Sequence, residues 1–432
     1  MVGEGAGTGL ARQPQVQGAF NCCFWVQVEG EAQQWVVRFP LKGVVSDETT
    51  LARMRSEIAT IQFLYRHTKI PVPAIVGYNA SENDFPLFMI TESVEGMRMT
   101  YLLALDIPPH ILDRVCRDLT RIHLELLSHP SDRIGMLDLS AEVPDFPRPT
   151  LGPYSLDAIE HERDGVHTSK GEPFASVQEY YKYKCSVWRQ RLEGQRNAIT
   201  SIGDGRRKIL DEMILNEGIG RINAQDDHGP FYLVHPDLRA SNVILHPETM
   251  HVVAIIDWEG ACFLPLTSSC TPPKALFSCQ VRDLAPGSTN YITYYTRSKR
   301  YVKIFSVEEK KLLAESDSDS TVAAKMASNL EDDLVFLIWT LDDVRTVDLV
   351  VWQYLAPRSF TDLRARLGAT IARFPEDEER ARAVTKLFTD FALEQLITTH
   401  GELKEKDSWI KKKLEALKDY KKQLRADTDS NK

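Results

Sequence analysis

Several features that would mark a special class of protein are scarce or missing from this sequence. Its seven cysteines are an odd number and form no Cys-x-x-Cys pair, which excludes a disulfide framework and the usual zinc signatures. No apolar run is long enough to span a bilayer. Basic residues are not in excess, and the net charge of −9 argues against a general nucleic-acid or membrane-surface role.

The N-terminal segment Met1–Gln17 also lacks a targeting signal. It has no apolar core like that of a secretory signal, and it is not rich in Arg and Ser like a transit peptide. Its alternating glycines follow no strand and do not have the spacing of a dinucleotide-binding loop. We therefore expect a flexible terminus, residues 1–17, on a cytoplasmic protein. At 432 residues the chain is long enough for two or more domains or lobes.

What the sequence does contain is a polar loop followed by two apolar runs. Asp237 and Asn242 share the loop H-P-D-L-R-A-S-N, which leads into V-I-L, and Asp257 follows the second run, V-V-A-I-I. The H-P-E-T between the runs is typical of a turn, so we expect an antiparallel hairpin that brings the three polar residues together. One carboxylate can then orient a hydroxyl, while the amide and the other carboxylate hold Mg²⁺ on phosphates. This pattern indicates a kinase-type site.

The H-x-D-x-x-x-x-N loop and the following I-I-D-W-E resemble the aminoglycoside phosphotransferase family, a branch of the protein-kinase-like fold. The resemblance implies an α+β, two-lobed fold, with an antiparallel-sheet N-lobe carrying one helix and a mainly helical C-lobe. It also implies that Asp237 is the catalytic base and that Asn242 and Asp257 are Mg²⁺ ligands. Pro236 stands where the family often has glycine, which should change the stiffness of the loop more than its chemistry.

The β-rich runs Gly18–Val28 and Gln34–Pro40 flank a Glu-Gly turn and predict an antiparallel hairpin. The resemblance implies that the first turn lies over the nucleotide phosphates, that Asn21 is among the nucleotide-binding residues, and that the second strand carries a phosphate-contacting cation. That cation is Arg38 instead of Lys. Arginine is always charged and binds phosphate bidentately, so it can replace lysine with a different geometry. An exposed strand arginine is the alternative. A fungal-type subgroup of the family shares V-V-R-F-P.

A helix is expected downstream of this hairpin, because apolar residues from Leu51 to Tyr65 recur at helical spacing. Glu57 lies beside this stripe, where a kinase-like helix carries the Glu that pairs with the strand cation; a solvated Glu is the alternative. The resemblance further places a hinge after the apolar run at 86–92, where the backbone of Glu92 to Val94 would bind adenine. Backbone contacts of this kind carry no side-chain signature that separates ATP from GTP.

The resemblance divides the chain into an N-lobe at 18–95, which binds nucleotide, and a C-lobe at 96–400. Within the C-lobe, residues 130–230 form an insertion rich in Pro, Gly and charge, which would wall the acceptor site. Residues 401–432 predict a basic amphipathic helix that could bind a membrane or acidic partners, or pack one face on its own domain. Further helices are expected at Ile111–Leu127, whose His123 should be structural, and at Asp332–Leu355 and Ala381–Ile397.

The resemblance as a whole implies an enzyme, a phosphotransferase that moves the γ-phosphoryl group of ATP or GTP to a hydroxyl of a small molecule with the help of Mg²⁺. Arg38 motivates one alternative, a catalytically weak or inactive nucleotide-binding scaffold on the same fold. A protein kinase is disfavoured because no G-x-G-x-x-G loop is present and no A-P-E segment follows Asp257. The family phosphorylates choline, sugars, amino-alcohols and antibiotics, so the acceptor stays open.

Overall fold

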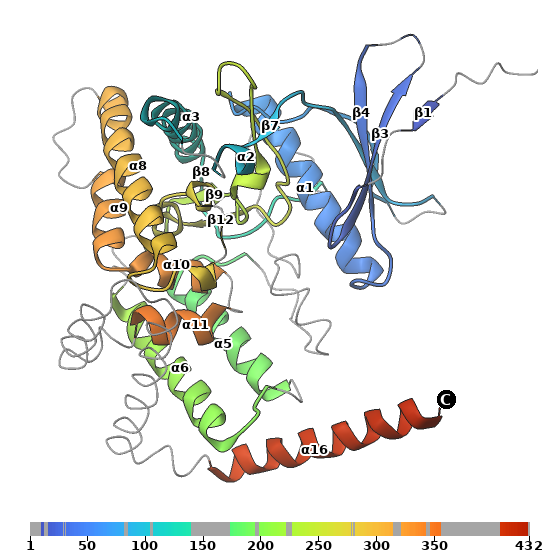
Figure 1. Ribbon diagram of the computed structural model, residues 1–432, viewed down its shortest axis with the longest axis vertical. Coiled ribbons are helices and arrows are strands. Elements are labelled where there is room, and N and C mark those ends of the chain that lie inside the picture. The colour runs from blue at the N-terminus through green and yellow to red at the C-terminus, as the bar shows by residue number, and fades with distance from the viewer. Residues whose placement is uncertain are drawn as a thin grey trace, which may run out of the picture.

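The computed structural model has a sheet-containing N-lobe and a mainly helical C-lobe, which confirms the expected α+β, two-lobed kinase-like fold (Figure 1). The sheet and helix α1 form one side of the molecule, and the helices of the C-lobe form the other. The structure describes residues 10–12, 16–28, 30, 32–81, 85–103, 107–139, 173–194, 198–221, 227–277, 279, 281–313, 321–342, 346–355 and 407–430.

The N-lobe sheet is antiparallel and its strands run in the order β1-β3-β4-β6-β5, with β2 also paired to β3. The predicted hairpin is present as β3 and β4, in a register that pairs Cys23 with Arg38. The strands are β1 (Leu10–Arg12), β2 (Val16–Gln17), β3 (Asn21–Val28), β4 (Gln34–Pro40), β5 (Ile75–Asn79) and β6 (Phe88–Glu92).

Part of the N-terminal segment departs from our expectation of a flexible terminus. Residues 10–12 and 16–17 lie as β1 and β2 against the outer edge of β3. An uncovered sheet edge presents unpaired N–H and C=O groups, and short β-compatible segments can satisfy them. Composition alone carries no sign of this pairing.

Helix α1 (Asp47–His67) is the single long helix among the described N-lobe residues. The Ser46 side chain caps it by accepting a hydrogen bond from the Thr49 N–H at 3.2 Å, which satisfies one of the free amides of the first turn. Its buried face carries the expected apolar stripe but also two charged residues one turn apart, Arg53 and Glu57. Buried charges are rare unless they are paired, so this face marks a polar interior.

The C-lobe strands hold the loop that contains Asp237. The predicted hairpin is present as β10 (Val243–Leu245) and β11 (Val252–Ile255), and β7 (Met97–Arg98) pairs with β10. A second small sheet contains β8 (Pro130–Ser131), β9 (Phe231–Val234) and β12 (Cys262–Pro265). The loop therefore runs from β9 to β10, and Asp257 comes just after β11.

The helices of the C-lobe pack around fully buried aromatic side chains, among them Tyr294, Tyr301, Phe305 and Phe336. The helix expected at Ile111–Leu127 is confirmed as α3, and the described residues of Asp332–Leu355 are largely helical, as α10, α11 and the π-helix η6 (Val351–Leu355). Ala381–Ile397 lies outside the described residues. The helices are α2 (Met99–Leu103), α3 (Pro109–Leu127), α5 (Val177–Gly194), α6 (Ile202–Arg221), α7 (Leu266–Ser269), α8 (Thr289–Leu313), α9 (Val322–Glu331), α10 (Leu334–Asp342), α11 (Val347–Val350) and α16 (Asp407–Ser430).

The first turns of helix α16 pack on the C-lobe, as one of our two alternatives expected. Ile410 is fully buried, and a Cβ placed on Gly205 of α6 would lie 2.8 Å from an Ile410 methyl carbon, so the two helices are in close contact. In the parts of the chain that the structure describes, every helix is too short or too polar to cross a membrane.

Candidate active site

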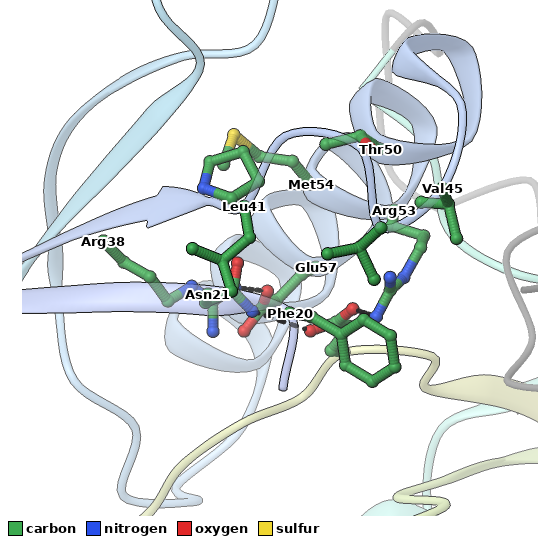
Figure 2. A pocket seen from close by; sticks show the side chains of 12 residues that line it. Phe20, Asn21, Arg38, Leu41, Val45, Thr50, Arg53, Met54 and Glu57 are labelled. Carbon is green, nitrogen blue, oxygen red and sulfur yellow. Dashed lines mark hydrogen bonds and ion pairs between the residues drawn. The ribbon is translucent and has the colours of Figure 1, made fainter. Parts of the chain in front are cut away.

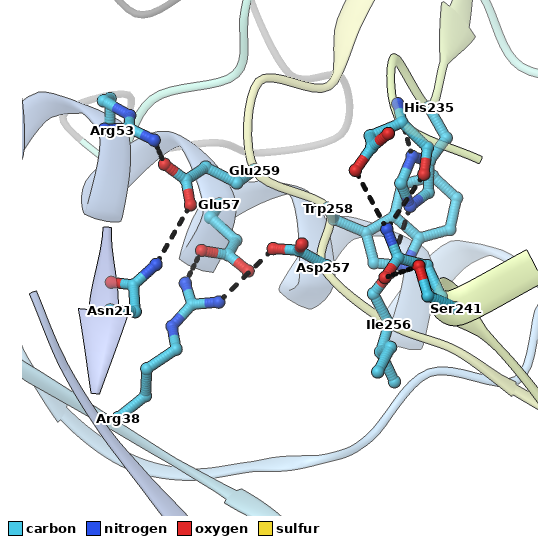
Figure 3. Close-up of polar contacts among 12 residues, drawn as sticks. Asn21, Arg38, Arg53, Glu57, His235, Ser241, Ile256, Asp257, Trp258 and Glu259 are labelled. Atoms are coloured by element: carbon cyan, nitrogen blue, oxygen red, sulfur yellow. Dashed lines mark hydrogen bonds and ion pairs between the residues drawn. The ribbon is translucent and has the colours of Figure 1, made fainter. Parts of the chain in front are cut away.

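The site lies between the lobes, where β4 and α1 face the β9–β10 loop and the end of β11 (Figure 3). Backbone hydrogen bonds wind the loop into a tight turn: the Arg239 N–H donates to the Asp237 carbonyl at 2.7 Å, and the Asn242 N–H donates to the Arg239 carbonyl at 2.9 Å. The Asn242 side-chain amide then donates to the Asp237 carbonyl at 2.9 Å and to its carboxylate at 3.2 Å. The loop thus holds Asp237 and Asn242 together, as the sequence led us to expect.

His235 joins this loop to the segment that follows β11. Its Nδ1 accepts the Asp237 N–H at 3.2 Å, so the proton of the neutral ring is on Nε2, which donates to the Ile256 carbonyl at 3.1 Å. Burial lowers the pKa of His235, which favours this neutral form. The ring packs 4.7 Å from that of Trp258, whose indole N–H donates to the Ile255 carbonyl at 3.0 Å. His235 therefore acts as an internal support for the site.

Asp257 has a left-handed backbone conformation with φ 66°, which is uncommon for a residue with a side chain. Such a conformation costs on the order of 1–3 kcal/mol and is found most often at functional sites. The preceding residue, Ile256, donates its N–H to the Asn242 carbonyl at 3.0 Å, and this bond places the ends of the two strands side by side. Asp237, Asn242 and Asp257 are thus brought into one site.

The N-lobe presents Arg38 to this site. Its guanidinium forms an ion pair with Glu57 of α1, and the other terminal nitrogen lies 3.7 Å from an Asp257 carboxylate oxygen. The side chains of Arg38 and Glu57 are only 14% and 2% exposed. Burial lowers the pKa of Arg38, and the carboxylate of Asp257 opposes this effect. The alternatives of an exposed strand arginine and a solvated Glu57 are therefore wrong.

The turn beside Arg38 is not the Glu-Gly turn that we expected in the hairpin. Gly30 lies at the far end of the hairpin, beyond the last pair, Gln27 with Gln34. The turn near Arg38 is formed by residues 18–20, and the Leu41 N–H fastens it to β4 by donating to the Phe20 carbonyl at 2.7 Å. We expected these residues to be strand, because their glycine and aromatic content does not separate a turn from a strand end.

The expected hinge residues begin at Glu92, the last residue of β6, and continue to Val94. The Glu92 N–H donates to the Ala74 carbonyl and the Ser93 N–H to the Gln34 carbonyl, both at 3.0 Å, so the sheet uses both amides. Among the described residues, the Val94 N–H donates to no partner. Of the two residues assigned to adenine, Val94 has the available donor, and recognition of a base by Glu92 would have to use its carbonyl group.

Three further residues belong to the site but were not assigned from the sequence. Arg53 of α1 forms an ion pair with Glu259, and the other Glu259 oxygen accepts a hydrogen bond from the Asn21 amide at 3.2 Å. Arg239 forms an ion pair with Asp237 at 2.7 Å. Two signals were available: Glu259 closes the I-I-D-W-E motif, and Arg53 stands one helical turn before Glu57.

The donor set suits a hard divalent cation. Asp257 offers a carboxylate that is 41% exposed, and Asn242 offers an amide oxygen, which are the groups that Mg²⁺ prefers. No cluster of three or more His, Cys, Asp or Glu side chains in the described part of the chain could hold a metal ion by itself. Mg²⁺ commonly binds through one or two protein ligands together with substrate phosphates and water, so these residues fit a metal that enters with a nucleotide.

The chain is similar to several known proteins. A subtelomeric hrmA-associated cluster protein of Aspergillus fumigatus is 54% identical over 33 residues, which are 8% of this chain and 6% of the relative's length. An ADP-bound aminoglycoside phosphotransferase, APH(2'')-Ib, is similar at 14% identity and a TM-score of 0.43, covering 88% of this chain and 92% of its own. An ethanolamine kinase of Plasmodium vivax is similar at 11% identity and a TM-score of 0.41, covering 90% and 82%.

The family comparison covers more than half of the sequence. The model of the phosphotransferase enzyme family matches residues 21–267, a stretch that begins at β3 and includes the Arg38–Glu57 pair, the β9–β10 loop and the D-W-E segment. Membership of the fungal-type subgroup stays a prediction. The chain belongs to the phosphotransferase enzyme family.

Proposed function

We propose that the protein transfers the γ-phosphoryl group of ATP or GTP to a hydroxyl group of a small molecule. The observation that supports this most is the position of Asp257, which follows β11 and lies 3.7 Å from Arg38 of the N-lobe, beside the loop that holds Asp237 and Asn242. A cation on one lobe thus faces the acidic groups of the other across the interlobe site. Phosphoryl transfer needs this combination, because its catalysis depends on positioning and on charge stabilisation.

In this proposal each residue has one task. Asp237, with its side chain 30% exposed, orients the acceptor hydroxyl and accepts its proton. Arg38, held by Glu57, stabilises charge on the phosphates. Asn242 and Asp257 would hold Mg²⁺, which when bound neutralises the charge that develops on the phosphate oxygens.

The nucleotide and the acceptor are assigned to opposite sides of this loop. The nucleotide base lies at Glu92 to Val94, and the turn at 18–20 covers the phosphates. On the other side, a cavity of about 80 Å³ lies between the β9–β10 loop and α10, lined in part by Pro236, Leu238, Lys274 and Trp339. This largely apolar space suits a small molecule better than an extended polypeptide, which supports a small acceptor over a protein substrate.

Two nearly isosteric substitutions test the proposal. Asp237→Asn removes the base but leaves the nucleotide contacts, so it should retain Mg-nucleotide binding and lose at least about 100-fold of the transfer rate. Asp257→Asn removes a metal ligand and should impair both. Binding is measured by thermal stabilisation with Mg²⁺ and ATP or GTP, where nucleotide at a hundred times its Kd adds about 2.7 kcal/mol.

Turnover is measured as nucleotide hydrolysis, in which water replaces the acceptor, and then across a panel of hydroxyl metabolites. A wild type that binds Mg-nucleotide but neither hydrolyses it nor transfers phosphate to any metabolite would favour the inactive scaffold. Equal turnover of Asp237→Asn and an active wild type would remove Asp237 from the role of base.

A further inference from the structure

Arg53, Glu259 and Asn21 form a second bridge between the lobes, separate from the contact between Arg38 and Asp257 (Figure 3). Arg53 comes from α1, Glu259 lies two residues after Asp257, and Asn21 begins β3 directly after the turn at 18–20. One Glu259 oxygen pairs with the Arg53 guanidinium, and the other accepts the Asn21 amide. We call these three residues the clasp. It connects the turn, the helix and the D-W-E segment through one carboxylate.

The clasp is largely shielded from water. The side chains of Arg53 and Glu259 are 7% and 16% exposed, so solvent screens this ion pair less than a surface pair. The Arg53 guanidinium also lies 4.5 Å from the centre of the Phe20 ring, which adds a cation–π contact to the turn itself (Figure 2). Burial lowers the pKa of Arg53 to about 10, with a contribution from the nearby Arg38, so the side chain is still charged at neutral pH.

The polar groups of the clasp are engaged with one another. Asn21, Arg53 and Glu259 line a cavity of about 20 Å³ together with Arg38 and Glu57, which is room for about one water molecule. Asn21, which we had assigned to nucleotide binding, donates an amide N–H to Glu259. The three residues are therefore placed to orient neighbouring parts of the site.

We propose that the clasp positions the turn at 18–20 relative to Asp257. The turn then covers the nucleotide phosphates at the place where Asp257 would bind their metal ion. The proposal rests on the proposed function. Asp257 has an uncommon left-handed backbone, and the chain is anchored before and after it. Before it, Ile256 donates a hydrogen bond to Asn242; after it, Glu259 belongs to the clasp. Asn21, Arg53 and Glu259 are thus positioning residues. Losing one should affect both nucleotide affinity and turnover, because misplacement by about 1 Å can cost about 100-fold in rate.

Three substitutions remove different parts of the clasp. Asn21→Ala removes only the hydrogen bond between Asn21 and Glu259. Glu259→Gln keeps the shape of the side chain without its charge, and Arg53→Met removes the cation. We expect nucleotide kcat/KM to fall about 10-fold for Asn21→Ala and about 100-fold for Arg53→Met, with Glu259→Gln between them. Arg53→Lys, which keeps the charge, should recover part of the loss. Asn21→Ala leaves the ion pair intact, so it stays informative if Arg53→Met does not fold.

Arg55→Met is the matched control. Arg55 lies on the same helix and forms an ion pair with Asp138, which follows α3 in the C-lobe, at 3.0 Å, so it also bridges the lobes but away from Asp257. This variant should change the unfolding temperature without changing nucleotide KM or kcat. A higher nucleotide KM together with a lower kcat in every clasp variant, and neither change in Arg55→Met, would support the proposal.

Three outcomes would overturn it. Clasp variants that match an active wild type in KM and kcat would reduce the clasp to a structural contact, while leaving the proposed function intact. An increased Mg²⁺ requirement in Glu259→Gln, with Asn21→Ala and Arg53→Met unchanged, would make Glu259 a metal ligand instead. A wild type that neither binds nor hydrolyses Mg-nucleotide would refute the proposed function and the clasp together.

Discussion

Arg38 carries the positive charge of a buried ion pair, so removing it should have separable effects on stability and on nucleotide binding. Arg38→Met leaves the Glu57 carboxylate, with its side chain 2% exposed, as a buried charge without its cation. Breaking a buried pair in this way costs about 3–5 kcal/mol. At about 2.1 cal/mol/K of unfolding entropy per residue, a chain of 432 residues shifts by about 1 °C per kcal/mol, so the unfolding temperature should fall by roughly 3–6 °C.

The double variant Arg38→Met with Glu57→Leu separates the two effects. Replacing both members of a buried pair by apolar side chains is often neutral or stabilising, so the double variant should regain most of the stability. It should not regain Mg-nucleotide binding, because the cation that we propose for the phosphates is still missing. Arg38→Lys should retain part of the binding, since a lysine ammonium keeps the charge but loses the bidentate geometry.

Urea unfolding and calorimetric titration with Mg-nucleotide measure these two quantities independently. A loss of less than about 1 kcal/mol in Arg38→Met would refute the reasoning from the buried charge. Wild-type nucleotide affinity in the double variant would refute the role of Arg38 at the phosphates, whatever its effect on stability.

Two further predictions concern the scaffold. Burial lowers the pKa of His123 from 6.5 to about 4, so between these pH values the unfolded chain binds a proton that the folded chain does not. The free energy of unfolding should therefore fall by at most about 3 kcal/mol as the pH drops from about 6.5 to about 4. His123→Gln should flatten this dependence, whereas His110→Gln, an exposed control, should not. Gly96→Ala should cost about 1–3 kcal/mol in urea unfolding, because its Cβ would lie 2.7 Å from the Leu245 carbonyl oxygen, whereas Gly77→Ala meets nothing within 4 Å and should be nearly neutral.

The sequence was most informative where the interacting residues are close together in the chain. The loop with Asp237 and Asn242 and the hairpin that ends before Asp257 span about twenty residues, so apolar runs and a turn signal were enough to predict their meeting. The Arg38–Glu57 pair also followed, but only through the resemblance, because periodicity by itself leaves a helix glutamate free to point at solvent. Prediction from the residues alone therefore extends as far as their chemical type and the local pattern around them.

The clasp could not be predicted in the same way. Asn21 and Glu259 are 238 residues apart, and no local signal reports the rotation that turns Arg53 toward a particular carboxylate. Helices α5 and α6 escaped prediction for another reason: the segment at 130–230 is rich in Pro, Gly and charge as a whole, and this average conceals two helical stretches within it. Contacts across long sequence separations depend on tertiary packing, which overrides local propensity.

The arginine at position 38 has a geometric reason in this structure. Its planar guanidinium pairs with Glu57 through one terminal nitrogen and lies 3.7 Å from Asp257 through the other, so one side chain spans a helix of the N-lobe and the proposed metal ligand of the C-lobe. A lysine presents one compact ammonium group and cannot offer two separated nitrogens in a fixed plane. Arg53, which stands one helical turn before Glu57 on α1, forms an ion pair with Glu259 of the D-W-E segment. The D-W-E segment is therefore held by two arginines on one side and by the buried Trp258 beside His235 on the other, and Asp257 is fixed between them. An arginine at position 38 can therefore hold the proposed metal ligand more rigidly than a lysine could, and it is no argument for lost catalysis.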